Sequence, residues 1–179
     1  DCVIQAAAIG KMVMLEDATP EQWRDVLDIN VIGANNITQA AVPHLRETNG
    51  NLLYFSTTGA SYTGPWAGLG VYQVSKAAMN HLVGHWRAES PGVGFTVVTI
   101  GECPGGEGDA QSQFALEFDR ELMGKVAGDW FAKGHMSGNF IDIEELTDQF
   151  HGLVRSSGGS MSIPHVTIIP RPPQPAADE

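Results

Sequence analysis

The fold is indicated by the apolar stretch Leu52-Leu53-Tyr54-Phe55, which follows Gly50 and precedes a loop rich in Gly, Ser and Thr. A short run of this kind, bounded by turn residues, is typical of a strand that is buried on both faces of a parallel sheet. A strong helical segment follows at residues 71–88, and then a β-branched run at residues 95–100. This alternation of strand, helix and strand predicts a parallel α/β sheet.

The alternation extends upstream of this stretch. Residues 2–9 form a short apolar run, and we expect a strand there that is buried on both faces. A helix begins after Thr19, because Thr19 as N-cap, Pro20 at the first helical position and Gln22 together form a capping-box pattern. Its apolar positions continue this helix over residues 20–45.

The alternation also extends downstream. Residues 110–136 indicate helical but irregular structure. Asp142 and Glu145 form the start signal of a further helix, which we expect to end near Val154. Residues 166–169 are β-branched and predict a last strand.

Length and composition predict one globular domain. The chain has 179 residues, of which 42% are hydrophobic and 17% charged, and this is ordinary for a soluble domain. We expect one domain over residues 1–169 and a proline-rich tail over residues 170–179.

Charge and cysteine content exclude several classes of partner. The formal net charge of -11 repels phosphate backbones and anionic lipid, so we expect neither nucleic-acid nor membrane-surface binding. Cys2 and Cys103 lack metal-binding or redox spacing, and we predict no metal site. The N-terminus has no signal-peptide pattern. Together these features favour a cytoplasmic protein.

A tyrosine and a lysine open the helix that is predicted over residues 71–88. Tyr72 and Lys76 lie four positions apart and therefore share one face of a helix. A lysine cation beside a phenol favours the phenolate, so we expect the pKa of Tyr72 to fall. A tyrosine tuned in this way acts as acid or base on an alcohol oxygen. The two residues follow a strand and a glycine-rich loop, a place where open α/β sheets bind ligands.

Several motifs occur in an order that is typical of one enzyme family. Phe55-Ser56-Thr57-Thr58-Gly59 ends a strand, and Tyr72-Gln73-Val74-Ser75-Lys76 opens the next helix. Val26-Leu27-Asp28-Ile29-Asn30-Val31 lies upstream, after the strand end within residues 1–10. In this order, over roughly residues 1–105, the sequence resembles the short-chain dehydrogenase/reductase family. The resemblance implies part of a Rossmann-like, doubly wound parallel sheet, equivalent to strands 4 to 7 of the family fold.

The resemblance also implies roles for four residues. Tyr72 is the expected general acid/base, and Ser56 is expected to bind the substrate oxygen. Lys76 would lower the pKa of the tyrosine and bind the nicotinamide ribose, while Asn30 would hold a water that links Lys76 to solvent. The implied reaction interconverts an alcohol and a ketone or aldehyde, so a small alcohol or carbonyl compound is the expected substrate.

NAD or NADP is the cofactor that the resemblance implies. The family ends its corresponding strand with Asn-Asn-Ala-Gly beside the cofactor, and here these positions are Gln5-Ala6-Ala7-Ala8. Ala7 and Ala8, with Tyr72 and Lys76, are therefore the expected cofactor-binding residues.

Two positions depart from the family pattern. The connection from Ser56 to Tyr72 is longer than is usual in the family, so the loop must bulge. Thr57, Thr58 and Ser61 therefore remain candidates for the serine role beside Ser56. The Pro-Gly that follows the third strand is either Pro104-Gly105 or is replaced by Glu102-Cys103.

Other residues carry weaker signals. His81 and His85 share a helix face, but no ligand at suitable spacing completes a metal site, so a packing or subunit-facing role is favoured. The loop at residues 105–109 is too acidic to bind phosphate and favours a flexible loop on the substrate side. Four residues fall where the family has its variable substrate lid, and they either line the pocket or pack in the core: Met123, Trp130, Phe131 and Met136.

Assembly and alternative functions follow from the same resemblance. The helices at residues 20–45 and 71–88 form subunit interfaces in the family, which implies a homodimer or homotetramer. One alternative function is a catalytically silent relative that binds a dinucleotide as a sensor or scaffold. Another is a nucleotide-sugar epimerase or dehydratase, which uses the same Tyr/Lys arrangement, but the short C-terminal part leaves little room for its sugar-nucleotide domain.

The sequence also predicts what precedes it. No Gly-x-x-x-Gly-x-Gly motif follows a first strand, although the family uses such a turn to bind the cofactor pyrophosphate. We therefore expect about three β-α units of ~30 residues each upstream of Asp1, and an isolated chain that neither binds dinucleotide well nor catalyses. Sequencing the upstream coding region tests this expectation: it should encode a strand and a glycine-rich turn, and a stop codon or an unrelated domain there contradicts it.

Overall fold

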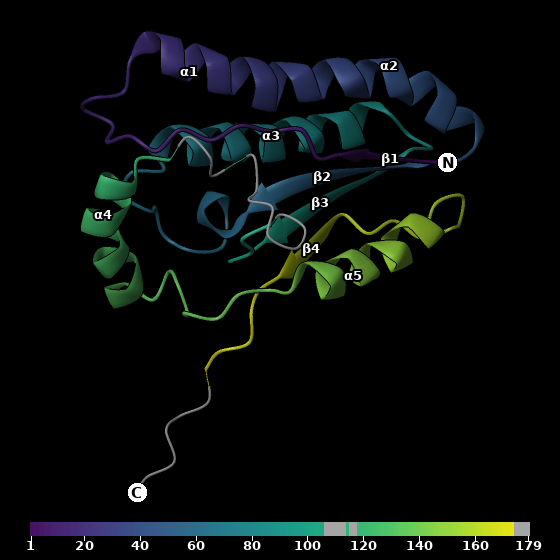
Figure 1. Cartoon of the computed structure of the whole chain (residues 1–179). Helices are drawn as coiled ribbons and strands as arrows, with labels where there is room; N and C mark the ends of the chain where they lie inside the picture. Colours follow the sequence, from purple (N-terminus) through teal and green to yellow (C-terminus); the bar gives the residue numbers. More distant parts are fainter. Residues whose placement is uncertain (106–113, 115–117, 174–179) are drawn as a thin grey trace, which may run out of the picture.

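The protein forms a four-stranded parallel sheet, shown in Figure 1 as a computed structural model that describes residues 1–105, Phe114 and residues 118–173. The strands lie side by side in chain order. They are β1 (Cys2–Gln5), β2 (Asn51–Thr57), β3 (Gly94–Ile100) and β4 (His165–Ile168). The predicted parallel α/β fold is therefore confirmed.

Helices cover both faces of the sheet (Figure 1). On one face lie α1 (Pro20–Leu27), the π-helix η1 (Asp28–Gly33), α2 (Ala34–Glu47) and α3 (Gly70–Glu89). On the other lies α5 (Ile143–Arg155). The 3-10 turn η2 (Thr58–Ala60) and α4 (Arg120–Ala132) lie beyond the carboxyl ends of the strands.

Apolar side chains join the layers. Between the sheet and the α2/α3 layer, Leu52, Tyr54 and Phe95 are fully buried. On the opposite face, Leu53 and Val98 pack with Leu153 of α5. Burying one such side chain contributes roughly 1.5–3 kcal/mol. The central strands β2 and β3 are therefore the rigid base from which the loops at their carboxyl ends extend.

Helix starts follow the signals in the sequence. The Thr19 hydroxyl accepts from the backbone N–H of Gln22, and the Gln22 side chain accepts from the Thr19 N–H, so the predicted capping box is present. Asp142 caps α5 by accepting the N–H groups of Glu144 and Glu145.

Two elements differ from the prediction. The strand expected over residues 2–9 ends at Gln5, and it is not buried on both faces, because Ile4 is 45% exposed. Among the described residues β1 pairs only with β2, so it lies at an edge of the sheet. The helix expected over residues 20–45 is interrupted by η1 and extends to Glu47.

The structure reports on three further expectations. The irregular region at residues 110–136 contains α4, while residues 106–113 and 115–117 lie outside the described part of the chain. Residues 174–179 of the predicted tail lie outside it as well. In the part that is described, no helix combines the length and the hydropathy that crossing a bilayer requires.

Candidate active site

Ser56 lies near the end of β2, at the carboxyl edge of the sheet. Its side chain is 4% exposed, and its Oγ has no hydrogen-bond partner among the described residues. A buried hydroxyl without a partner costs roughly 1–3 kcal/mol, and such groups are common where a ligand completes the hydrogen bond. Of the alternatives to Ser56, Thr58 is buried, Thr57 is half-buried and Ser61 is exposed.

Lys76 connects the end of β2 to the first turns of α3. It is 4% exposed, and its Nζ donates to the carbonyl oxygen of Phe55 at 2.8 Å. The same Nζ lies 5.9 Å from the centre of the Tyr72 ring. The structure therefore brings Lys76 close to Tyr72 and to the residue that precedes Ser56.

Burial shifts the pKa values of both residues on this helix face. It lowers the pKa of Lys76 to about 8, because a charged ammonium is disfavoured away from water. It raises the pKa of Tyr72 for the same reason. The expectation that Lys76 lowers the pKa of Tyr72 is therefore wrong in this structure. Desolvation outweighs the attraction, since the ammonium donates to a backbone carbonyl rather than to the phenol oxygen.

Asn30 lies in the π-helix η1 and is 1% exposed. Its Oδ1 accepts from the N–H of Ile9 at 2.8 Å, and its Nδ2 donates to the carbonyl of Ile9 at 2.8 Å and to Ser75 Oγ at 2.9 Å. The Ser75 hydroxyl in turn donates to the carbonyl of Tyr72 at 2.6 Å. The carboxamide of Asn30 is thus occupied by structural bonds, and its proton-relay role stays a prediction.

Sequence reasoning missed Ser75, which links Asn30 to the Tyr72 turn. The signal was present in the sequence, because Ser75 lies between Tyr72 and Lys76 and is three residues from Tyr72, a spacing at which a hydroxyl reaches a backbone carbonyl within a helix. It was overlooked because a serine in a helix is usually a neutral surface residue.

Phe114 covers one side of Tyr72. The two ring centres are 4.6 Å apart and the rings are tilted by 54°. The Phe114 ring also lies against Gly10, where a Cβ atom would be 2.3 Å from it. Gly10 is the residue that allows an aromatic ring to lie between the chain after β1 and the start of α3.

Ala7 and Ala8 lie after the end of β1. Ala7 is exposed and Ala8 is half-buried. The Gln5 side chain accepts from the Ala7 N–H at 3.4 Å and donates to its carbonyl at 3.5 Å, which bends the chain away from the strand direction. The role of these two alanines in cofactor binding stays a prediction.

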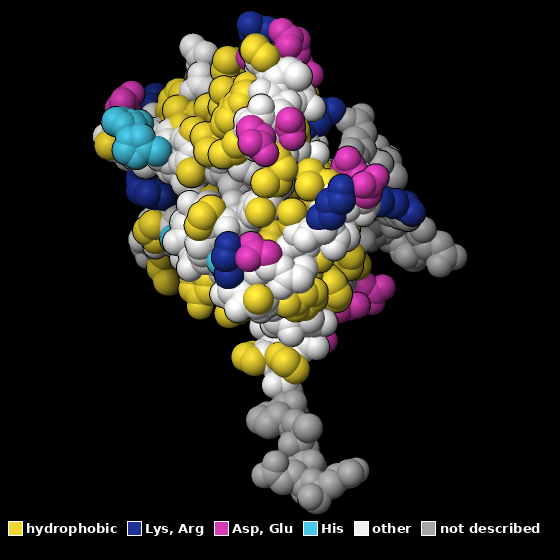
Figure 2. All heavy atoms as spheres, turned by 90° about the vertical axis from the view of Figure 1, so that its left-hand side faces the viewer, with side chains coloured by type: hydrophobic (Ala, Val, Ile, Leu, Met, Phe, Trp, Pro, Cys, Tyr) yellow, Lys and Arg dark blue, Asp and Glu magenta, His cyan; other side chains and the backbone are white. Residues whose placement is uncertain are grey.

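An aromatic and methionine-rich cluster lies beside the site, between α4 and the loops at the carboxyl edge. Trp66 and Trp130 have ring centres 5.3 Å apart, and Trp130 Nε1 donates to the carbonyl of Ala67 at 3.0 Å. Met123 and Met136 pack in this cluster, whereas Phe131 is 49% exposed. Figure 2 shows hydrophobic side chains gathered on this end of the molecule.

The remaining predicted features lie apart from this site. His81 and His85 are exposed and contact each other edge to face, with ring centres 4.9 Å apart. In the described ranges no group of three His, Cys, Asp or Glu residues is arranged to bind a metal ion. In the loop at residues 105–109, only Gly105 is among the described residues.

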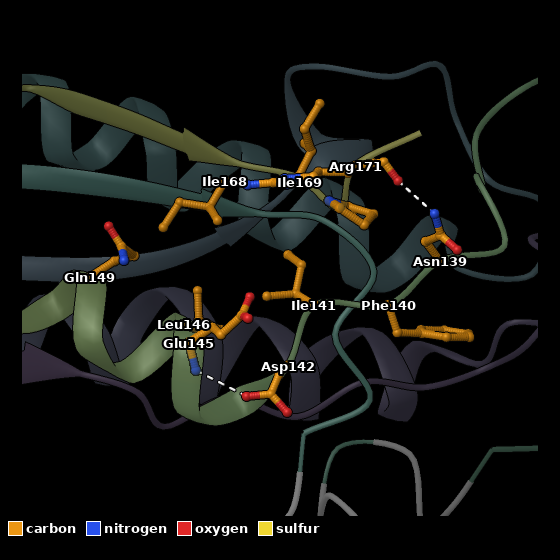
Figure 3. Close-up of a pocket in the computed structure, with 11 residues that line it drawn as sticks. Asn139, Phe140, Ile141, Asp142, Glu145, Leu146, Gln149, Ile168, Ile169 and Arg171 are labelled. Carbon is orange, nitrogen blue, oxygen red and sulfur yellow. Dashed lines mark hydrogen bonds between the residues drawn. The ribbon is translucent and has the colours of Figure 1, made fainter. Parts of the chain in front are cut away.

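A shallow cavity of about 500 Å³ lies between the start of α5 and the end of β4 (Figure 3). None of the four predicted catalytic residues lines it. Two of its polar side chains have structural roles, since Asp142 caps α5 and Asn139 Nδ2 donates to the carbonyl of Arg171 at 2.7 Å. The cavity lies at the junction between α5 and the chain after β4.

Comparison with known proteins identifies a family whose model matches more than half of the chain. A family model described as short chain dehydrogenase matches residues 1–110. The chain belongs to this family.

Curated relatives share this oxidoreductase family. This chain is 28% identical over 147 residues to an uncharacterized oxidoreductase of Schizosaccharomyces pombe. The alignment covers 80% of the chain and 56% of the relative. It is 34% identical over 103 residues to an 11-beta-hydroxysteroid dehydrogenase-like protein of Arabidopsis thaliana, covering 56% of the chain and 33% of the relative. The chain thus spans about half, or less, of the length of these relatives.

Solved structures of the family share the fold. An alcohol dehydrogenase from the archaeon Thermococcus sibiricus, complexed with 5-hydroxy-NADP, superposes with a TM-score of 0.73 at 17% identity, covering 99% of this chain and 66% of that one. A gluconate 5-dehydrogenase from Burkholderia cenocepacia, in complex with NADP and tartrate, gives 0.72 at 18% identity, covering 94% and 63%. The described sheet is therefore part of the Rossmann-like architecture of short-chain dehydrogenases.

Burial of Lys76 makes the stability of this short-chain dehydrogenase depend on pH. The folded chain releases the Lys76 proton near pH 8, whereas an exposed lysine keeps it to about 10.5. Between these values the unfolded chain binds more protons, so the free energy of unfolding rises with pH. Relative to Lys76→Met, we expect a rise of roughly 2–3 kcal/mol from pH 8 to pH 10 in urea titrations.

Other ionisable groups and a control variant must be considered in this measurement. The raised pKa values of Tyr54 and Tyr72 oppose the trend as the unfolded phenols ionise near pH 10, but both tyrosines are present in the wild type and in Lys76→Met, so their effect cancels in the comparison. Lys125→Met removes an exposed lysine, whose side chain is 68% exposed, and should leave the slope unchanged. Equal slopes for the wild type and Lys76→Met would contradict a buried, destabilised ammonium.

Proposed function

We propose that the protein is an NAD(P)-dependent oxidoreductase that interconverts an alcohol and a ketone or aldehyde, with Tyr72 as the acid/base group. The observation that supports this most directly is the convergence at the end of β2. There a buried Ser56 hydroxyl without a partner lies next to Phe55, whose carbonyl accepts from a lysine beside Tyr72. A hydroxyl that lacks a partner within the described chain is suited to bind a ligand oxygen.

The residues present fit the reacting end of a nicotinamide dinucleotide. An ammonium has three N–H donors, and Phe55 accepts one of those of Lys76. Within residues 1–105, Phe114 and residues 118–173 the other two donors of Lys76 have no hydrogen-bond partner, and we propose that they bind ribose hydroxyls. Bound there, the nicotinamide would supply or accept the hydride. Ala7 and Ala8 are the proposed lining on the β1 side.

The mechanism assigns separate tasks to the chain's own groups. Ser56 donates a hydrogen bond to the carbonyl oxygen as negative charge develops on it. Tyr72 donates its phenolic proton to that oxygen, and the alcohol forms once the carbonyl carbon has also received the hydride that the nicotinamide would supply. Because burial raises the pKa of Tyr72, the phenol is protonated at neutral pH and is ready to act as the acid in carbonyl reduction.

Lys76 contributes its charge to this step. Its pKa near 8 keeps it mostly cationic at neutral pH. The cation beside the Tyr72 ring stabilises the phenolate that remains after the proton has left. Asn30 is the proposed holder of a water that links Lys76 to solvent, so that a proton passed from Lys76 to the phenolate is replaced from solvent. Cytoplasmic location and homo-oligomeric assembly stay predictions beside this mechanism.

A catalytically silent family member is the alternative. It would bind the dinucleotide through Lys76 but would not need a buried acid/base group. The presence of Tyr72, Lys76 and Ser56 in one place favours catalysis over this alternative.

The substitution Tyr72→Phe separates the two alternatives. It removes only the phenolic oxygen, so we expect the fold and cofactor binding to persist while kcat falls by about 10²–10⁴-fold. The complete protein is assayed with NADH and NADPH against a panel of ketones and aldehydes, and dinucleotide binding is measured in parallel. Binding without turnover in the wild type would support the silent alternative, and unchanged kcat in Tyr72→Phe would refute the acid/base role.

Substitution of the candidate serines identifies the second donor. Ser56→Ala removes the buried hydroxyl and should lower kcat by about 10²-fold. Because that hydroxyl has no partner among the residues that the structure describes, the variant should be at least as stable as the wild type. Ser61→Ala, at an exposed position, is the control and should change neither quantity. A loss of activity in Ser61→Ala with normal activity in Ser56→Ala would reverse the assignment.

A further inference from the structure

The connection from Ser56 to Tyr72 is compact despite its length. It begins with the 3-10 turn η2, and the carbonyl of Thr58 accepts the N–H groups of Tyr62 at 2.7 Å and Thr63 at 2.9 Å. These bonds close the first part of the loop on itself. They do not connect it to α3, so another contact must hold the loop beside Tyr72.

Gln73 provides that contact. Its side chain is 5% exposed, and its Oε1 accepts from the backbone N–H of Trp66 at 3.1 Å. The same carboxamide lies against Gly59, where a Cβ atom would be 1.9 Å from Nε2. One side chain of α3 therefore touches both the turn after Ser56 and the later part of the loop.

We propose that Gln73 is a positioning residue, which holds the Ser56–Tyr72 loop and thereby keeps Ser56 and the Trp66 side of the site in place relative to Tyr72. This inference rests on the proposed function. Consecutive helix residues point about 100° apart, so Gln73 leaves the Tyr72 face free while it binds the loop. A Cβ atom at position 59 would displace the carboxamide that binds Trp66, so glycine at this position leaves room for the contact.

The loop that Gln73 holds also contacts α4. Trp66 packs against Trp130, with ring centres 5.3 Å apart, and its ring stacks on His135 at 5.9 Å. Trp130 donates to the Ala67 carbonyl, one residue beyond the Trp66 N–H that Gln73 binds. A shift of this loop therefore moves the turn that follows Ser56 and the aromatic cluster together, whereas Lys76 keeps its bond to the carbonyl of Phe55 within β2.

The first test compares Gln73→Met with the matched control Val74→Ala, a half-exposed position on the same helix. Met keeps the length of the side chain but has no strong acceptor for the Trp66 N–H. In the complete protein we expect kcat for ketone reduction to fall about tenfold and the KM for the ketone to rise, because the donors to its oxygen are misplaced. The KM for NADH or NADPH should stay unchanged, and tryptophan fluorescence should shift. Gln73→Glu keeps an acceptor and should restore part of kcat.

The second test is a double-mutant cycle that needs no turnover. Gly59→Ala should lower the midpoint of thermal unfolding more when Gln73 is present than in a Gln73→Ala background, since the shorter side chain leaves room for the new methyl group. Additive effects in the cycle, or wild-type kcat, KM and fluorescence in Gln73→Met, would overturn the inference. If the wild type turns over no substrate, the proposed function fails, while the cycle still decides whether Gln73 holds the loop.

Discussion

The arrangement of the site depends on the buried carboxamide of Asn30. It bonds both backbone groups of Ile9 and the hydroxyl of Ser75, and Ser75 bonds the carbonyl of Tyr72. Three segments far apart in the sequence, the chain after β1, the π-helix η1 and the first turns of α3, are joined by one side chain. Since a buried polar group without a partner costs roughly 1–3 kcal/mol, movement of any one segment would leave groups on the other two unpaired.

The π-helix is the local adjustment that places this carboxamide. A wider turn re-aims the side chains that follow it, and such bulges are frequent at functional sites. Here η1 directs Asn30 inward, whereas its neighbours Ile29 and Ile32 are exposed. A regular helix over the same residues would distribute these side chains with a period of 3.6 residues and would aim them differently. The interruption between α1 and α2 is therefore part of the site rather than a defect of the helix.

The general architecture could be predicted from the sequence because it depends on local signals. Apolar runs bounded by turn residues located the strands, and the Thr19 and Asp142 caps located helix starts. The spacing of Tyr72 and Lys76 placed both on one face of α3. Each of these inferences needs only a few neighbouring residues and the geometry of one element.

What could not be predicted depends on contacts between distant segments. Among the described residues β1 ends at Gln5, pairs with β2 alone and leaves Ile4 exposed, and an isolated apolar run does not show which segments pair with it or cover it. The raised pKa of Tyr72 follows from burial, including the ring of Phe114, which lies far along the chain. Spacing alone shows that a lysine is near a tyrosine, but the sign of a pKa shift depends on how much water remains around both.

The candidate site combines residues of the buried sheet and helix core with residues of the surrounding loops. The end of β2 and the first turns of α3 carry Ser56, Tyr72 and Lys76 on the most buried elements of the fold. The side of the site next to them, by contrast, consists of α4 and the Trp66 loop. These segments are held by a few hydrogen bonds, such as the bond from the Trp66 N–H to Gln73 and the bond from Trp130 to the Ala67 carbonyl. Under the proposed function, substitutions in α4 and the Trp66 loop would alter which carbonyl compound fits and would leave Tyr72 in place, so selectivity and proton transfer would be carried by separate parts of the chain.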